Sequence, residues 1–303
     1  MTRKTFLLGV GCQKGGTTWV HDHLSKHPQC ALGIAKEYHT FDTIASEQQR
    51  HLLLRSMKRL RFGLEKAERF LKSSPTIAID NKNKLLDGFD LAEQVERNLR
   101  KVLFSIDRED YVQYFSRLAM QDSIRLTGDI TPEYAVLSEQ NFRDIKQLIE
   151  EKGDLKIKVL FMMRDPIERI FSSEKMNCRR RGLDEEQAAI NTVDSYKKRT
   201  HAPKSQYEKT ISAIESVFDP SDIHYVFYEE LFKSKDLSQL YEFLELDDLI
   251  EADFGYNPLP SGKVKTSLDE KGVKEMRSYF DNTYKFVSDR FGAERISHIW
   301  KHF

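Results

Sequence analysis

The chain has 303 residues, of which 39% are hydrophobic and 32% are charged, and its formal net charge at pH 7 is zero. This length suits one large globular domain or two small ones, and we predict a single domain over residues 1–303. A zero net charge argues against wholesale binding to nucleic acid or to an anionic membrane, although it permits a local basic cleft.

The cysteine spacing and the start of the chain bear on where the protein works. Cys12, Cys30 and Cys178 have no paired spacing, so neither a disulfide framework nor a cysteine-based zinc site is indicated. The first predicted strand starts close to Met1 and leaves no room for a signal peptide. No apolar run approaches the roughly 20 residues that span a bilayer. We therefore expect a cytoplasmic protein without a membrane span.

The segment Gln13-Lys14-Gly15-Gly16-Thr17-Thr18-Trp19 connects an apolar run, residues 5–11, to a helix-like stretch from Val20 to His27. Glycines let the backbone come close to a ligand, and the first turn of a helix offers N–H groups that have no intrahelical partner. These donors and the helix dipole favour a phosphate, to which Lys14 adds a positive charge and Thr17 and Thr18 add hydroxyl groups. The pattern predicts a variant of the P-loop. An ordinary strand-to-helix turn is the alternative.

The position of the lysine separates this loop from that of nucleoside triphosphatases. Their pattern places the lysine after the last glycine, where it reaches the β- and γ-phosphates. Here Lys14 precedes the glycine pair and Thr17 follows it, so a 5′-phosphate group is the better prediction.

Predicted strands and helices alternate along the chain. Short apolar runs, typical of parallel strands buried on both faces, occupy residues 6–10, 76–79, 125–127, 156–163 and 223–228. Helical patterns occupy residues 140–152, 166–180, 185–199, 207–218 and 237–244. This order predicts an α/β fold with a central parallel sheet between helical layers, as in P-loop proteins. The charged, helix-rich region 43–123 is predicted to be an elaboration over the carboxyl edge of the sheet, where such folds bind ligands.

A second anion motif follows the predicted strand 156–163. Asp165 is a predicted N-cap, with Pro166 at the first helical position and Glu168 completing a capping box. Arg164 therefore leaves the carboxyl end of its strand, on the same rim as Lys14 if both strands belong to one parallel sheet, and Ser172 lies about two turns along the helix. Arginine and serine can share one anion, although a surface pair of Arg164 with an acidic neighbour is the alternative.

Together these motifs resemble the sulfotransferase superfamily, whose donor is 3′-phosphoadenosine 5′-phosphosulfate (PAPS). Lys14 to Thr18 look like the 5′-phosphosulfate loop, and residues 164–172 look like the 3′-phosphate motif. The resemblance implies that Lys14 contacts the bridging oxygen and the 5′-phosphate, while Arg164 and Ser172 hold the 3′-phosphate. It also implies donor contacts for Gln13, Trp19 against adenine, Tyr207 and Lys263. A core tryptophan is the alternative for Trp19, and an amphipathic helix start is the alternative for Tyr207.

Further segments are similar to the heparan sulfate and related carbohydrate sulfotransferases. They are Lys36-Glu37-Tyr38-His39-Thr40-Phe41-Asp42, Gly128-Asp129-Ile130-Thr131-Pro132-Glu133-Tyr134 and Tyr228-Glu229-Glu230-Leu231. By this resemblance Glu37 is the general base, His39 is its rival, and Asp42 and Lys82 contact the acceptor. If the stretch is extended, Glu37 and His39 share one face, and a solvated charged loop is the alternative. The predicted reaction needs no metal.

The acceptor stays open at this level: a hydroxylated small molecule, a lipid or a glycan, sulfated on oxygen or nitrogen. Two other classes of protein also stay open. A P-loop kinase would bind ATP with a metal, and a non-catalytic module would bind the bisphosphate without transferring sulfate.

Overall fold

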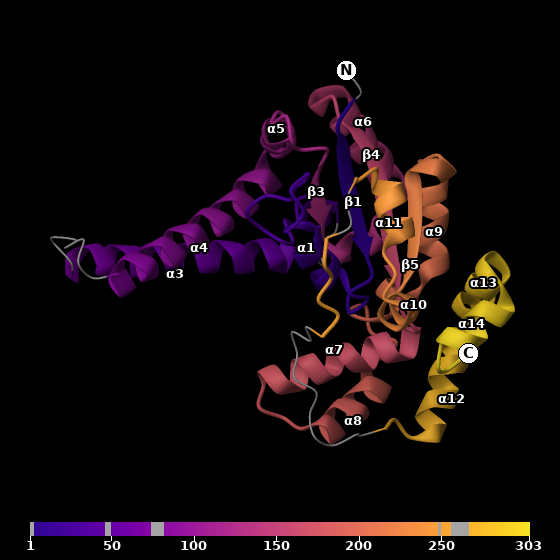
Figure 1. Cartoon of the computed structure of the whole chain (residues 1–303). Helices are drawn as coiled ribbons and strands as arrows, with labels where there is room; N and C mark the ends of the chain where they lie inside the picture. Colours follow the sequence, from indigo (N-terminus) through magenta and orange to yellow (C-terminus); the bar gives the residue numbers. More distant parts are fainter. Residues whose placement is uncertain (1–2, 46–49, 74–81, 248–249, 256–266) are drawn as a thin grey trace.

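The computed structural model describes residues 3–45, 50–73, 82–247, 250–255 and 267–303. Its centre is a five-stranded, fully parallel sheet in the order β2-β3-β1-β4-β5 (Figure 1). The strands are β1 (Thr5–Gly11), β2 (Cys30–Ala31), β3 (Leu126–Ile130), β4 (Lys156–Met163) and β5 (Ile223–Phe227). Because β1 pairs with both β3 and β4, the loop after β1 lies between the ends of those two strands.

Alternate residues of β1 enter two different cores, as a strand buried on both faces requires. Phe6, Leu8 and Val10 pack with the helices α5 (Arg108–Ala119), α6 (Glu139–Gly153), α9 (Tyr207–Glu215) and α13 (Asp281–Phe291). Leu7 packs on the other face with α1 (Thr17–Leu24), α10 (Tyr228–Ser234) and α11 (Ser238–Leu244). The result is the predicted three-layer α/β fold of P-loop type.

Most predicted elements are present, with small shifts at their ends. Strand β4 and helix α7 (Pro166–Arg180) have the predicted bounds, whereas α8 (Glu185–Ser195) and α9 end earlier than predicted. The two-residue strand β2 was not predicted, and the predicted strand 76–79 lies outside the described residues. The C-terminal helices α12 (Glu270–Tyr279), α13 and α14 (Ala293–Ile299) complete the described fold.

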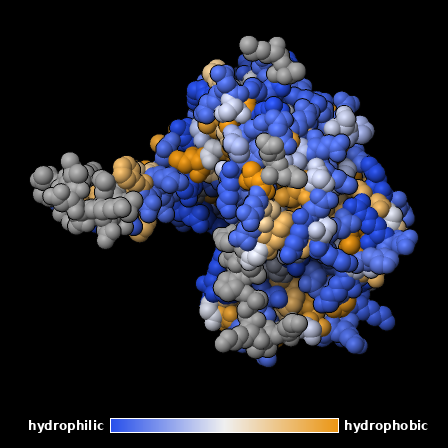
Figure 2. Space-filling view, in the orientation of Figure 1, coloured by the Kyte–Doolittle hydropathy of each residue, from blue (hydrophilic) through white to orange (hydrophobic). Residues whose placement is uncertain are grey.

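Residues 43–123 contribute two different features. Helix α5 packs on the sheet, where Phe115 meets Phe6 edge to face. After the short α2 (Asp42–Ala45), the long helices α3 (Arg50–Ser73) and α4 (Lys82–Ile106) pair with each other and project from the body, and we call this pair the arm (Figure 1). The space-filling view shows the projection with both hydrophilic and apolar side chains exposed on it (Figure 2). None of the helices in the described part of the chain is long and apolar enough to cross a membrane.

Candidate active site

The loop between β1 and α1 has a backbone that depends on its glycines. Gly16, the N-cap of α1, has a φ of 93°, and an added Cβ would lie 3.2 Å from both Met162 Cε and Phe232 Cε2. At Gly15 an added Cβ would lie 2.9 Å from Cys12 Sγ. The loop therefore lies close against the sheet and α10, as expected of a phosphate loop.

The N-terminus of α1 is open to an anion. No side chain caps it, and its first turn, which begins with Thr17 and Thr18, contains no acidic residue. The N–H groups of this turn therefore keep the partial positive charge of the helix end without a counter-charge from the helix itself.

Lys14 lies beside this helix end in a positive environment. Its Nζ is 3.9 Å from Met176 Sδ, and no ion pair of Lys14 is found within the described ranges. Burial, together with the positive charges of Arg164 and Arg180, lowers the pKa of Lys14 to about 8. An anion bound beside Lys14 would therefore stabilise its charged form.

Arg164 leaves β4 directly beside the loop. Its Nη1 donates to the Lys14 carbonyl oxygen at 3.3 Å, and its guanidinium lies 4.5 Å from the centre of the Tyr228 ring. The Nε is buried without a partner in the described structure, and the contact with Glu168 is long, at 3.9 Å. The pair with Glu168 that the sequence offered as an alternative is therefore present, but it is long and leaves the Arg164 Nε without a partner in the described structure.

The turn that holds Arg164 differs from the predicted capping box. Asp165 caps α7 by accepting from the N–H groups of Ile167 and Glu168 at 2.9 and 3.1 Å. Glu168 does not return to the Asp165 N–H, which instead donates to Glu229 Oε1 at 3.0 Å. The reason is that Glu168 bonds Lys301 and His302, each at 3.0 Å.

The weaker donor candidates have structural roles in this arrangement. The Tyr207 hydroxyl is buried and donates to the Arg164 carbonyl at 2.7 Å, so it supports the turn. Trp19 is 5% exposed, donates from Nε1 to the Asp253 carbonyl at 2.9 Å and stacks on Phe254. An adenine ring would have to share or displace this stacking partner.

Three further predicted residues are placed as follows. Ser172 is half-buried on α7, and its hydroxyl has no hydrogen bond to the described residues. Lys82 begins α4, and its backbone lies 15 residues, roughly 22 Å of helix, before Arg97, which contacts the segment that contains Glu37. Lys263 lies outside the described residues.

The second half of the site follows β2. His39 has a φ of 59°, so the segment is not a regular extended strand, yet Glu37 and His39 still point together. Glu37 Oε2 lies 3.6 Å from His39 Nε2, and the Lys36 ammonium donates to Glu37 Oε1 at 2.5 Å. The buried Asp42 holds His39 Nδ1 at 2.9 Å.

These contacts set the charges of both candidate bases. Burial opposes the charge on His39, but its bonds to Asp42 and Glu37 raise its pKa to about 10. Burial likewise opposes the charge on Glu37, but His39 and Lys36 hold the pKa of that carboxyl well below its usual range. At neutral pH the pair is an imidazolium beside a carboxylate.

Glu133 is a member of this site that the sequence did not assign. It lies on the 3₁₀ turn Pro132–Val136 after β3, is 7% exposed, and accepts from Lys204 Nζ at 3.0 Å. Ligand atoms of Glu37, His39 and Glu133 lie within 4.8 Å of one another, which is close enough for a metal ion. Lysines already neutralise both carboxylates, so the charge of this cluster does not require a metal. In the sequence, the one signal for Glu133 was its place in the segment Gly128 to Tyr134.

Gln13 joins the two halves. Its Nε2 donates to Glu133 Oε1 at 3.4 Å, and its Oε1 accepts from the Ser173 hydroxyl at 3.5 Å. The positive charge of Lys36 also lowers the pKa of Lys14. One continuous site therefore has an anion-binding half at Lys14 and Arg164 and a carboxylate half at Glu37 and Glu133.

Comparisons with known proteins identify a family and similar solved structures. A family model described as the Sulfotransferase family matches residues 7–250. A sulfotransferase from Alicyclobacillus acidocaldarius is similar in structure, with a TM-score of 0.53, 15% sequence identity, and coverage of 95% of this chain and 96% of that one. The sulfotransferase domain of the Synechococcus PCC 7002 olefin synthase has a TM-score of 0.43 and 17% identity, over 90% of this chain and 83% of that one. A comparison with curated protein sequences finds no match.

Proposed function

Because the chain belongs to the sulfotransferase family, we propose that it transfers the sulfuryl group of PAPS to a hydroxyl or amine of an acceptor. One observation carries the proposal: Lys14, which has no acidic partner in the described structure, and Arg164, which has only a distant one, share one site with a paired carboxylate, and Gln13 bonds Glu133 on the carboxylate side. Transfer needs an anion site for the donor and a proton acceptor beside it, and these two halves supply both.

The donor half fits a bisphosphate. Lys14 and the open N-terminus of α1 would hold the 5′ side, and Arg164 with its unpartnered Nε would hold the 3′-phosphate, with Ser172 on the same helix. PAPS would supply an activated sulfuryl group and a leaving group that is already anionic. Lys14 and the helix N–H groups would neutralise the charge that grows on the leaving oxygen.

The acceptor half favours Glu37 over His39 as the base. A base must be unprotonated, and the raised pKa of His39, about 10, keeps its ring charged at neutral pH. Glu37 is ionised, so it can take the acceptor proton as the bond from the acceptor to sulfur forms. His39, held by Asp42, would orient the Glu37 carboxylate. The low pKa of Glu37 makes it a weak base, so we expect the proton to move late, once the bond to sulfur has made the acceptor more acidic.

Calorimetry tests the donor assignment. Adenosine 3′,5′-bisphosphate should bind in the presence of EDTA, and Arg164→Ala should weaken it about tenfold more than adenosine 5′-phosphate, because only the former carries the 3′-phosphate. Arg143→Ala, which removes an exposed arginine of α6, is the matched control. Tight magnesium-dependent binding of ATP would instead identify a kinase. Bisphosphate binding with no transfer to any acceptor would identify a binding module.

A further inference from the structure

The arm carries a concentration of positive charge that the whole chain does not. Helix α3 contains eight lysines and arginines and two acidic residues, although the net charge of the chain is zero. The rest of the molecule is therefore acidic overall, and the basic surplus is concentrated on this helix.

Five of these cations, among them Lys66 and Arg69, have no acidic partner within the described residues, and three of the five lie together. Arg61 pairs with Glu65, and Lys72 pairs with Glu68, but Arg55, Lys58 and Arg59 have no ion pair in the described part of the chain. Their spacing places them on one side of the helix. With Phe62 and with Gln94 of α4, they line a groove of about 270 Å³.

The adjoining face of α4 leads from this groove to the active site. Arg97 donates to the Ile34 carbonyl at 3.0 Å, and Ser105 meets Thr43 Oγ1 at 3.5 Å, so both contact the segment that contains Glu37. Lys101 lies one turn from each of them on the same face. Gln94 of the groove lies on this face as well, two turns before Lys101.

Lys101 extends the cationic surface inward. It is half-buried, and its ammonium has no hydrogen bond among the described residues. Burial lowers its pKa, the charge of Arg59 acts in the same direction, and the charge of Glu37 opposes the shift. The charge of Arg59 in the groove and the charge of the proposed base, Glu37, therefore both act on the Lys101 ammonium.

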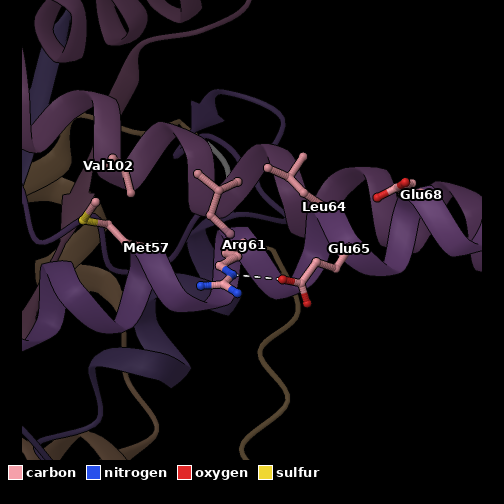
Figure 3. A pocket seen from close by; sticks show the side chains of 7 residues that line it. Met57, Arg61, Leu64, Glu65, Glu68 and Val102 are labelled. Carbon is pink, nitrogen blue, oxygen red and sulfur yellow. Dashed lines mark hydrogen bonds and ion pairs between the residues drawn. The ribbon is translucent and has the colours of Figure 1, made fainter.

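The opposite side of the arm has a different character. A pocket of about 320 Å³ there is lined by Met57, Leu60, Leu64 and Val102, with Arg61 already bonded to Glu65 at its rim (Figure 3). The three cations that lie together therefore belong to one side of the arm, the side that continues to Glu37.

We infer that Arg55, Lys58, Arg59 and Lys101 form an anion-binding extension of the acceptor site, and that the acceptor carries a carboxylate, phosphate or sulfate group away from the atom that is sulfated. This inference rests on the proposed function. A second copy of the chain would bring the same positive charge to this surface. Continuity with Glu37 favours an acceptor over an unrelated anionic partner.

Binding of a small polyanion tests the inference directly. The protein is first saturated with adenosine 3′,5′-bisphosphate, which occupies the donor half, and is then titrated with inorganic tripolyphosphate at low ionic strength. The double variant R59Q/K101Q should bind tripolyphosphate about tenfold more weakly, because two charge-assisted contacts are lost. Glutamine keeps the helix propensity of the arm. Arg61→Gln, on the other side of the same helix, should bind as the wild type does.

The first titration keeps the two proposals separate. Failure of bisphosphate to bind would contradict the proposed function, whereas unchanged bisphosphate affinity with no tripolyphosphate binding would overturn the anion site. Equal weakening by R59Q/K101Q and by Arg61→Gln would overturn it too, since it would show a general charge effect.

A second measurement addresses the acceptor itself. A metabolite extract is separated by anion exchange, and each fraction is incubated with the protein and labelled PAPS. Label should enter compounds of the retained fraction, with a higher KM and a kcat within about twofold for R59Q/K101Q. Label confined to the neutral flow-through would overturn the inference.

Discussion

The two halves of the site solve opposite electrostatic problems. At the anion-binding half, Lys14 has no acidic partner in the described structure and Arg164 has only a distant one. At the carboxylate half, Glu37 contacts Lys36 and His39, and Glu133 contacts Lys204. The anion-binding half therefore carries positive charge that an anion would neutralise, whereas the charges of the carboxylate half already balance.

This difference separates binding from chemistry. An unpaired, partly buried cation destabilises the free protein, and a bound phosphate offsets this loss of folding free energy. A paired carboxylate is stable on its own, and it must exchange partners before it can take a proton. Variants that disable one half at a time distinguish the two roles.

The largest effect on turnover is expected at the anion-binding half. Lys14→Met should lower turnover by about 10² to 10³, because the leaving group loses its neutralising charge. The ligand-free protein should become more stable by about 0.5–2 kcal/mol, since an unfavourable buried charge is removed. Steady-state kinetics and thermal unfolding measure the two changes. A variant that is both less active and less stable would contradict the contrast between the halves.

Removal of the proposed base comes next. Glu37→Gln should lower turnover about 10²-fold and leave bisphosphate affinity unchanged, because it alters the carboxylate half only. His39→Ala is the matched comparison and should have a smaller effect. If Glu37→Gln turns over normally and His39→Ala does not, the histidine is the base.

The pair formed by Glu133 and Lys204 should contribute to stability more than to transfer. Glu133→Gln leaves the nearly buried Lys204 ammonium without its counter-charge, at a cost of roughly 2 kcal/mol in the free energy of unfolding. The double variant E133Q/K204M should recover most of that loss in chemical denaturation. Equal stability of the single variant and the wild type would show that the pair is not formed in solution.

The smallest expected effect is on the pH dependence of binding. Lys14 has a pKa of about 8 in the free protein, and a bound anion must raise it. Binding above pH 8 therefore takes up a proton, so bisphosphate affinity should fall as pH rises from 8 to 9, by less than about tenfold. Lys14→Met should remove this slope. Calorimetry in two buffers of different ionisation enthalpy would count the proton.

The sequence predicted the features that depend on neighbouring residues. The loop at Lys14, strand β4 and helix α7 follow from apolar runs, glycines and an N-cap within short windows. Strand β2 was missed because two residues carry no periodicity, and its pairing with β3 decides that they form a strand. The capping box failed at Glu168 because the partners that hold it are more than 130 residues away.

The same limit applies to the site. Glu37 and His39 are two residues apart, so their association was visible in the sequence. Glu133 meets Lys204 across 71 positions, and Arg97 of the arm reaches Ile34 across 63. Only the folded chain brings these residues together, which is why the carboxylate half was predicted incompletely.

The strand order also divides the molecule in a way that bears on how new specificities arise. Lys14 and Arg164 follow β1 and β4, whereas Glu37 and Glu133 follow β2 and β3 on the other side of β1. The arm is inserted after the β2 loop and before β3, so it joins the chain on the acceptor side alone. Under the proposed function, insertions or replacements there would change which molecule is modified, while β1 and β4 keep their sequence. Such a fold would keep the chemistry of transfer on one side of the sheet and let the choice of acceptor vary on the other.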